Sequence, residues 1–212
     1  MNRRLKIDIQ TVPALILITV NVLLFLISVF RPGFEDAFGI SVQSVLVEGD
    51  YFRLVKYMFM HAGWQHILAN MVLLFFISSM NLGLQSVLKY VVVYFSSGIL
   101  GGLLELFLRS RLFPGSDVFA IGASGAIMGL VGSTLVLFLV KRKALPKEAR
   151  RDTIIRLLLL TAVNLVPTSG SVDYLGHASG FVVGAALTFL LSLGSLIRPE
   201  EAVEDDEPVS EE

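Results

Sequence analysis

Residues 121–130 read IGASGAIMGL and organise the fold, because they place a serine between glycines inside an apolar run. At a helical period Gly125 and Gly129 fall on one face, so a neighbouring helix can approach the backbone closely. Gly122 permits a bend that a residue with a Cβ seldom adopts. Two interpretations stay open for this stretch: a packing seam of small residues, or a nucleophilic Ser124 at a helix start beside free backbone N–H groups.

The composition is typical of a helical membrane protein. The 212 residues are 54% hydrophobic and 17% charged, with a mean hydropathy of +0.74. Apolar stretches of about 18 or more residues recur, which is the length that a bilayer core demands. The absence of cysteine excludes disulfides and thiolate metal sites. We expect one polytopic domain without a cleavable signal peptide.

Six membrane spans are predicted, joined by connections of distinct composition. The spans cover about residues 12–30, 64–84, 87–108, 118–140, 153–166 and 172–197. The connection between the first and second spans mixes charged and aromatic residues, which favours an interfacial subdomain over a free linker. The predicted organisation is an N-terminal cytoplasmic segment (1–11), a six-helix membrane domain (12–197) and an acidic, disordered cytoplasmic tail (198–212).

The positive charges predict the orientation of these spans. If the N-terminus is cytoplasmic, 12 of the 17 Lys and Arg residues lie on the cytoplasmic side, and residues 141–151 alone supply six of them. The other five, which include Arg109, lie outside. The positive-inside rule therefore favours a multi-pass protein with both termini in the cytoplasm.

Polar side chains from three spans are predicted to meet at one depth near the outer side. His66 and Asn70 are four residues apart in the second span, so they point the same way. Ser124 and His177 lie about six and five residues into the fourth and sixth spans, which is a similar depth at about 1.5 Å per residue. Asp173 is about one turn outward and no carboxylate is expected beside the imidazole, which favours a dyad over a triad.

These groups allow more than one interpretation. A lone histidine or asparagine in a span is more often a hydrogen-bonding group between helices than a catalyst. Their shared depth instead favours His177 as a base to Ser124, with His66 and Asn70 as oxyanion donors. A transporter or channel that binds a transition metal through its histidines, His61 included, is a third possibility, but no carboxylate or thiolate is expected to complete that site. We therefore expect no metal and no cofactor.

Three stretches resemble the motifs of rhomboid intramembrane serine proteases: HAGWQHILANM (residues 61–71), GASGAIMG (122–129) and GHASGFVVG (176–184). Their order and their spans match the six-helix form of that family. The resemblance implies that Ser124 is the nucleophile and His177 the general base. It also implies that His66 and Asn70 help the Ser124 backbone N–H to hold the oxyanion.

The resemblance also implies supporting roles for several other positions. His61 matches an additional upstream histidine of the family that is not part of the dyad. Gly122 and Gly125 flank the serine of the family's G-x-S-G pattern. Gly180 and Gly184 match the G-x-x-x-G through which the sixth helix packs against the fourth.

The chain departs from the family pattern at three places. A Trp-Arg pair of the first outer loop appears here as Phe52-Arg53, which keeps an aromatic anchor and the cation. An acidic residue usual in the second span is replaced by Leu82, with Asn81 beside it, and this leaves a supporting interaction there in question. A position that is aromatic in some members is Met128, a softer side chain.

The function that the resemblance implies is an intramembrane serine endopeptidase in an all-α, six-helix rhomboid-like bundle. Its expected partners are single-pass or polytopic membrane proteins, cut in their transmembrane segments near the outer face, and the lipid bilayer, with no nucleic acid. By analogy with short six-span forms, a bacterial cytoplasmic membrane is expected. The alternative is a catalytically silent relative that serves as a membrane adaptor or chaperone, although such a relative need not keep Ser124 and His177. The fifth span, which lacks glycine seams, is the candidate lateral gate.

Overall fold

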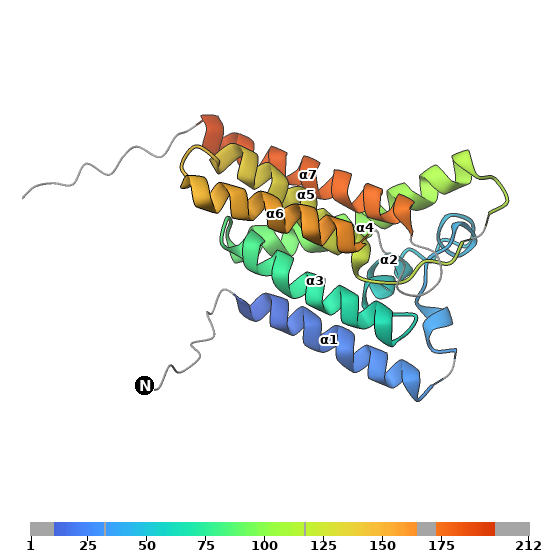
Figure 1. Cartoon of the computed structure of the whole chain (residues 1–212). Coiled ribbons are helices and arrows are strands. Elements are labelled where there is room, and N and C mark those ends of the chain that lie inside the picture. The colour runs from blue at the N-terminus through green and yellow to red at the C-terminus, as the bar shows by residue number, and fades with distance from the viewer. Residues whose placement is uncertain (1–10, 32, 117, 165–172, 198–212) are drawn as a thin grey trace, which may run out of the picture.

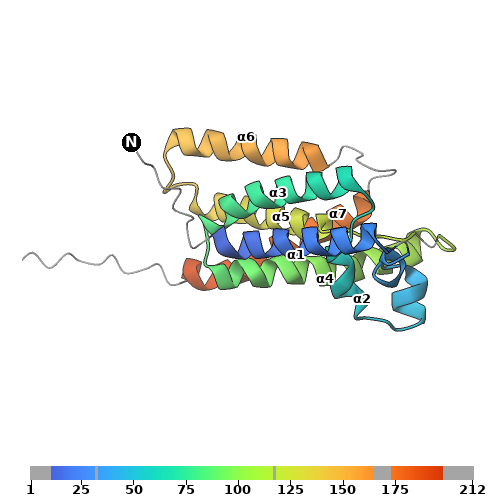
Figure 2. The same ribbon diagram turned by 90° about the horizontal axis from the view of Figure 1, so that it is seen from below.

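The computed structural model describes residues 11–31, 33–116, 118–164 and 173–197, with side chains up to residue 193. The expected acidic tail and nearly all of the N-terminal segment lie outside these residues. In the described ranges the chain is helical and has a single isolated β-bridge, which confirms the all-α class. Six long helices run side by side (Figures 1 and 2). Their bounds are α1 Val12–Val29, α3 Trp64–Leu82, α4 Val87–Leu112, α5 Ser124–Lys141, α6 Lys147–Asn164 and α7 Tyr174–Ile197.

Five of the described helices are long and apolar enough to cross a membrane, namely α1, α3, α4, α5 and α7. The helix that corresponds to the predicted fifth span, α6, does not meet that measure. It begins inside the basic segment, and Lys147, Arg150, Arg151 and Arg156 occupy its first turns. Its apolar part is therefore short, and α6 lies at the edge of the bundle (Figure 2).

The buried centre of the bundle is α5. Every residue from 125 to 134 is buried, as expected for a helix that is surrounded by other helices. On one side its glycines face α7: a Cβ built on Gly180 would lie 2.7 Å from the carbonyl carbon of Gly125. A Cβ on Gly184 would lie 2.6 Å from the Cα of Gly129. Only glycines allow the two backbones to approach this closely, so this contact fixes how α7 sits on α5.

A polar contact between the end of α3 and the middle of α5 lies beside one of the departures from the family pattern. Asn81 of α3 is fully buried, and its Nδ2 donates to Ser133 Oγ and Thr134 Oγ1 of α5, each at 3.0 Å. The neighbouring Leu82 is buried among apolar side chains. The hydrogen-bonding link between these helices is thus made by the asparagine next to the substituted position.

The connection between α1 and α3 is folded against the end of the bundle where α3, α5 and α7 begin (Figure 1). It contains the short helical turns η2 Glu35–Ala37, η3 Val42–Val47, α2 Arg53–Lys56 and η4 Tyr57–Phe59. Arg53 holds it together, because its guanidinium donates to the backbone oxygens of Asp36 (2.8 Å) and Gly39 (2.9 Å) and pairs with Asp50. Phe52 is 67% exposed, as expected for an aromatic side chain at a membrane interface.

Candidate active site

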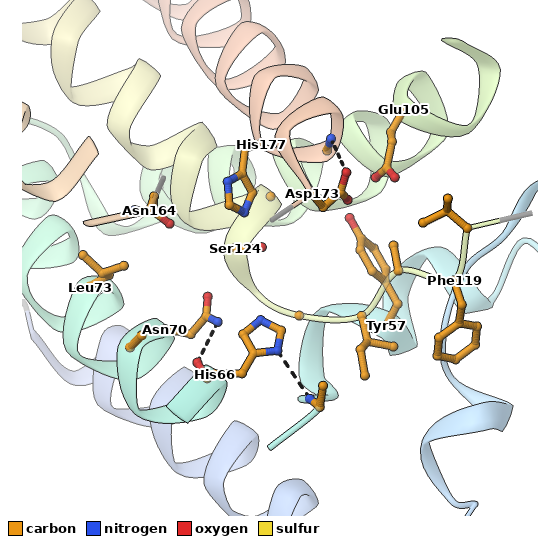
Figure 3. A pocket seen from close by; sticks show the side chains of 18 of the residues that line it. Tyr57, His66, Asn70, Leu73, Glu105, Phe119, Ser124, Asn164, Asp173 and His177 are labelled. Atoms are coloured by element: carbon orange, nitrogen blue, oxygen red, sulfur yellow. Dashed lines mark hydrogen bonds between the residues drawn. The ribbon is translucent and has the colours of Figure 1, made fainter. Parts of the chain in front are cut away.

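A cavity of about 430 Å³ lies at this end of the bundle and brings together the four polar side chains that the sequence singled out. His66 and Asn70 come from the first two turns of α3, Ser124 is the first residue of α5, and His177 stands in the first turn of α7. Figure 3 shows the Ser124 hydroxyl between the rings of the two histidines. The side chains that the sequence predicted at one depth therefore line one cavity.

Ser124 is presented by a tight, non-helical approach to α5. The predicted fourth span was wrong at its start, because residues 118–123 are not helical and Ala120 instead pairs with Ile40 in the β-bridge. Gly122 has a φ of +134°, which favours glycine, and its N–H donates to the backbone oxygen of Tyr57 at 3.0 Å. A Cβ there would lie 2.9 Å from His66 Nε2 and 3.7 Å from Ser124 Oγ. Gly122 thus keeps these two polar groups close to each other.

His177 is nearly buried, with 8% of its surface exposed, and its backbone N–H donates to the oxygen of Asp173 at 3.0 Å. Its Nδ1 atom has no hydrogen-bond partner among the described residues. His177 and Ser124 line the same cavity, and no hydrogen bond joins them in the described part of the chain. Catalytic hydrogen bonds are often long before substrate binds, so this geometry is compatible with a Ser–His pair.

Hydrogen bonds to the backbone leave an N–H donor free on each of the side chains of His66 and Asn70. His66 Nδ1 accepts a hydrogen bond from the Ala62 backbone N–H at 3.3 Å, so the proton of the neutral ring lies on Nε2, the atom beside Gly122. Asn70 Nδ2 donates one hydrogen to the backbone oxygen of His66 at 2.9 Å, which leaves its second N–H available to the cavity. Both groups can donate to an oxygen atom placed beside Ser124 (Figure 3).

His61 supports the ring of His66 from behind. The two ring centroids are 5.0 Å apart with an interplanar angle of 68°, and His61 is buried to 97%. Burial, reinforced by repulsion from His66, lowers the pKa of His61 to about 3. His61 is therefore neutral at physiological pH and packs against its neighbour without adding a charge to the site.

The structure also shows lining residues that sequence reasoning missed or misplaced. Tyr57 is buried, its hydroxyl donates to the Gly98 oxygen at 2.7 Å, and burial raises the pKa of its phenol well above the ordinary value. No local pattern pointed to Tyr57.

Arg109 was expected in an outer loop, but α4 continues to Leu112 and buries most of the Arg109 side chain. Glu105, one turn earlier, places a carboxylate on the cavity wall where none was expected. The signal available in the sequence was the spacing of Glu105 and Arg109, which are four residues apart at the end of the predicted third span.

No arrangement for a metal ion is found in the described ranges, where no group of three or more His, Asp or Glu side chains could hold one. The three histidines of the sequence instead have two kinds of surroundings: one packs against a neighbouring ring, and two line the cavity. His61 is behind His66, and His177 faces the cavity from α7. The chemistry that the site can perform with its own residues is nucleophilic attack by a hydroxyl, with an imidazole as base and N–H groups as donors.

Comparisons with known proteins agree with these motifs. A family model described as the rhomboid domain matches residues 48–194. RHOMBOID-like protein 4 of Arabidopsis thaliana is 33% identical over 163 residues, which cover 76% of this chain and 38% of that protein. RHOMBOID-like protein 1 of the same plant is 33% identical over 170 residues, covering 78% and 40%. Rhomboid protease GluP of Bacillus subtilis is 26% identical over 155 residues, covering 71% and 29%. The match to this chain thus spans two fifths or less of the length of each of these relatives.

Proposed function

This chain belongs to the rhomboid family, and on that premise we propose that it is an intramembrane serine endopeptidase with Ser124 as nucleophile and His177 as general base. The observation that carries the proposal is the common cavity, which is lined by one hydroxyl and one imidazole from neighbouring helices, with His66 and Asn70 opposite. Ser124 Oγ attacks the scissile carbonyl while His177 takes its proton. The same proton then passes to the leaving amine.

The negative charge that develops on the carbonyl oxygen needs donors that are already in place. His66 Nε2, the free N–H of Asn70 and the Ser124 backbone N–H supply them in this proposal. Ser124 begins α5, so its N–H is one of the groups that have no partner within the helix. Removing one such donor typically costs about 3–4 kcal/mol of barrier.

The proposed substrates are transmembrane segments of single-pass or polytopic proteins, cut near the outer face of the bilayer. The cavity lies at the end of α5 opposite to Lys141 and the basic segment, and positive charge favours the cytoplasmic side. We infer that both termini are cytoplasmic and that water reaches Ser124 from outside, in a bacterial cytoplasmic membrane by analogy. An intact helix hides its carbonyls, so substrates that unwind easily near the cut are preferred.

Entry for such a segment is proposed beside α6. Only Leu157 and Asn164 of this helix are buried, so it has few anchoring side chains. Asn164 and Val163, at the end of α6, line the cavity directly. A displacement of α6 would therefore open the cavity to the bilayer without disturbing the α5–α7 contact.

The test is cleavage of a single-span reporter by reconstituted protein, compared for the wild type, Ser124→Ala and His177→Ala. Wild-type cleavage that both substitutions abolish is the expected result. Labelling of the wild type, but not of Ser124→Ala, by a fluorophosphonate gives the same answer without a substrate. If the wild type neither cleaves nor labels while it binds membrane clients, the adaptor or chaperone alternative replaces the protease.

A further inference from the structure

A buried ionic cluster joins α4 to the start of α7 at the rim of the cavity. Arg109 Nε donates to Glu105 Oε1 at 2.7 Å on the same helix, and its Nη2 donates to Asp173 Oδ1 across to α7. The side chains of Glu105, Arg109 and Asp173 are 2%, 12% and 27% exposed, and all three line the cavity that contains Ser124. The cluster is therefore part of the same cavity wall as the proposed dyad.

Asp173 connects this cluster to His177. Its Oδ1 atom accepts a hydrogen bond from the Gly176 N–H at 3.0 Å, and its backbone oxygen accepts one from the His177 N–H at 3.0 Å. A carboxylate at this position caps the first turn of α7 and complements the positive end of the helix dipole. Because the same carboxylate is bound by Arg109, α4 determines where the first turn of α7 lies.

The two carboxylates of the cluster depend on Arg109 for charge balance. A Cβ built on Gly176 would lie 2.6 Å from Glu105 Oε2 and 2.9 Å from Asp173 Cγ, so both acidic groups converge on this backbone position. Without the guanidinium they would be like charges facing each other next to the first turn of α7. Buried charges that lose their partner are strongly unfavourable, so the turn would have to move or take up a proton.

His177 thus stands between two anchors on α7. Asp173 holds the helix four residues before it, and Gly180 fixes the backbone against Gly125 three residues after it. The glycine contact sets the distance between α7 and α5. The ionic cluster sets the direction in which the first turn of α7 extends from that contact. The direction decides whether the imidazole reaches the hydroxyl of Ser124.

We propose that Glu105, Arg109 and Asp173 form a positioning cluster that aligns His177 with Ser124. The inference rests on the proposed function, because alignment matters only if the two residues react as a pair. Apolar residues could hold two helices together at least as well as a buried ion pair does. The stability of the helix contact therefore does not by itself account for an ionic cluster at the rim of the cavity, and we expect the cluster to affect the reaction as well.

The test measures the rate of Ser124 labelling by a fluorophosphonate, together with kcat and KM for the reporter, on the full chain in detergent. Arg109→Gln is expected to lower the labelling rate and kcat by about tenfold or more, since a misplacement near 1 Å costs about a hundredfold, with KM changed less than about threefold. Asp173→Asn keeps an acceptor for the Gly176 N–H and loses the charge, so a smaller loss is expected. Arg109→Gln combined with Glu105→Gln removes the repulsion and should recover part of the lost rate.

Asn81→Ala is the matched control, because it also breaks a buried polar link between two helices, but this link joins the end of α3 to the middle of α5, outside the residues that line the cavity. It should lower the thermal midpoint and leave the labelling rate of folded protein unchanged. The inference is overturned if Arg109→Gln and Asp173→Asn label at the wild-type rate, or if the double variant is no faster than Arg109→Gln. If Arg109→Gln does not fold, Asp173→Asn decides the question alone. Failure of the proposed function looks different, since the wild type itself would then show no Ser124-dependent labelling.

Discussion

Replacing Gly180 with alanine should move His177 away from Ser124 and slow the proposed reaction. The added Cβ would lie 2.7 Å from the carbonyl carbon of Gly125, whereas ordinary contacts begin at 3.4 Å. The backbone of α7 must therefore retreat by about 0.7 Å or more, and Gly101 of α4, which also contacts Gly180, must adjust with it. Overpacking of this kind typically costs about 1–3 kcal/mol of stability.

The larger effect is expected on the reaction. His177 is three residues from the displaced position, and a shift near 1 Å in a reacting group costs about a hundredfold in rate. We expect kcat for a single-span reporter, and the rate of fluorophosphonate labelling, to fall by about 10- to 100-fold at temperatures where the variant is folded. The measurement is a comparison of both rates with the thermal midpoint of the same preparation.

Gly83→Ala is the control for this experiment. Gly83 follows α3 with a φ of −71°, and a Cβ there would meet only ordinary contacts at 3.5 Å, so both rates and the midpoint should stay near the wild type. A Gly180→Ala protein with wild-type kcat and labelling would refute the argument that the glycine contact sets the geometry of the site.

Three further substitutions and one treatment test other parts of the site. Asn70→Ala should lower kcat by about 100- to 1,000-fold with little change in KM, because it removes one oxyanion donor; an unchanged kcat would exclude that role. Gly122→Ala should abolish cleavage and cost about 1–3 kcal/mol of stability, since its φ is +134° and the new Cβ would meet His66 Nε2 at 2.9 Å; a fully active variant would contradict this. For His61 the native pKa of about 3 lies below the unfolded value of about 6.5, so the stability that its neutral form contributes is lost as pH falls through this range, by up to about 1.4 kcal/mol per pH unit. The free energy of unfolding, measured between pH 7 and 4, should depend less on pH in His61→Gln than in the wild type. Equal slopes for the two proteins would argue against a lowered pKa of His61. A strong chelator should leave cleavage unchanged, whereas inhibition that zinc reverses would revive the metal interpretation.

Local features of the sequence were enough to predict the class of the protein and four of the polar side chains that line its cavity. Runs of apolar residues fix where helices form in a membrane, and the spacing of His66 and Asn70 fixes that they share a face. The all-α membrane fold and the rhomboid family are confirmed. The catalytic roles of Ser124 and His177 stay predictions.

Tertiary structure alone decided how the helices are rotated against one another and that α5 starts at Ser124. Arg109 and Asp173 are 64 residues apart in sequence and Tyr57 and Gly98 are 41 apart, so no local period could have paired them. The start of α5 at Ser124 was likewise set by Tyr57, which binds the Gly122 N–H and holds the preceding residues out of the helix. Periodicity specifies one face of one helix, but the rotation and depth of each helix depend on the side chains that fill the space between them. That is why the polar layer could be predicted from the sequence and the ionic cluster beside it could not.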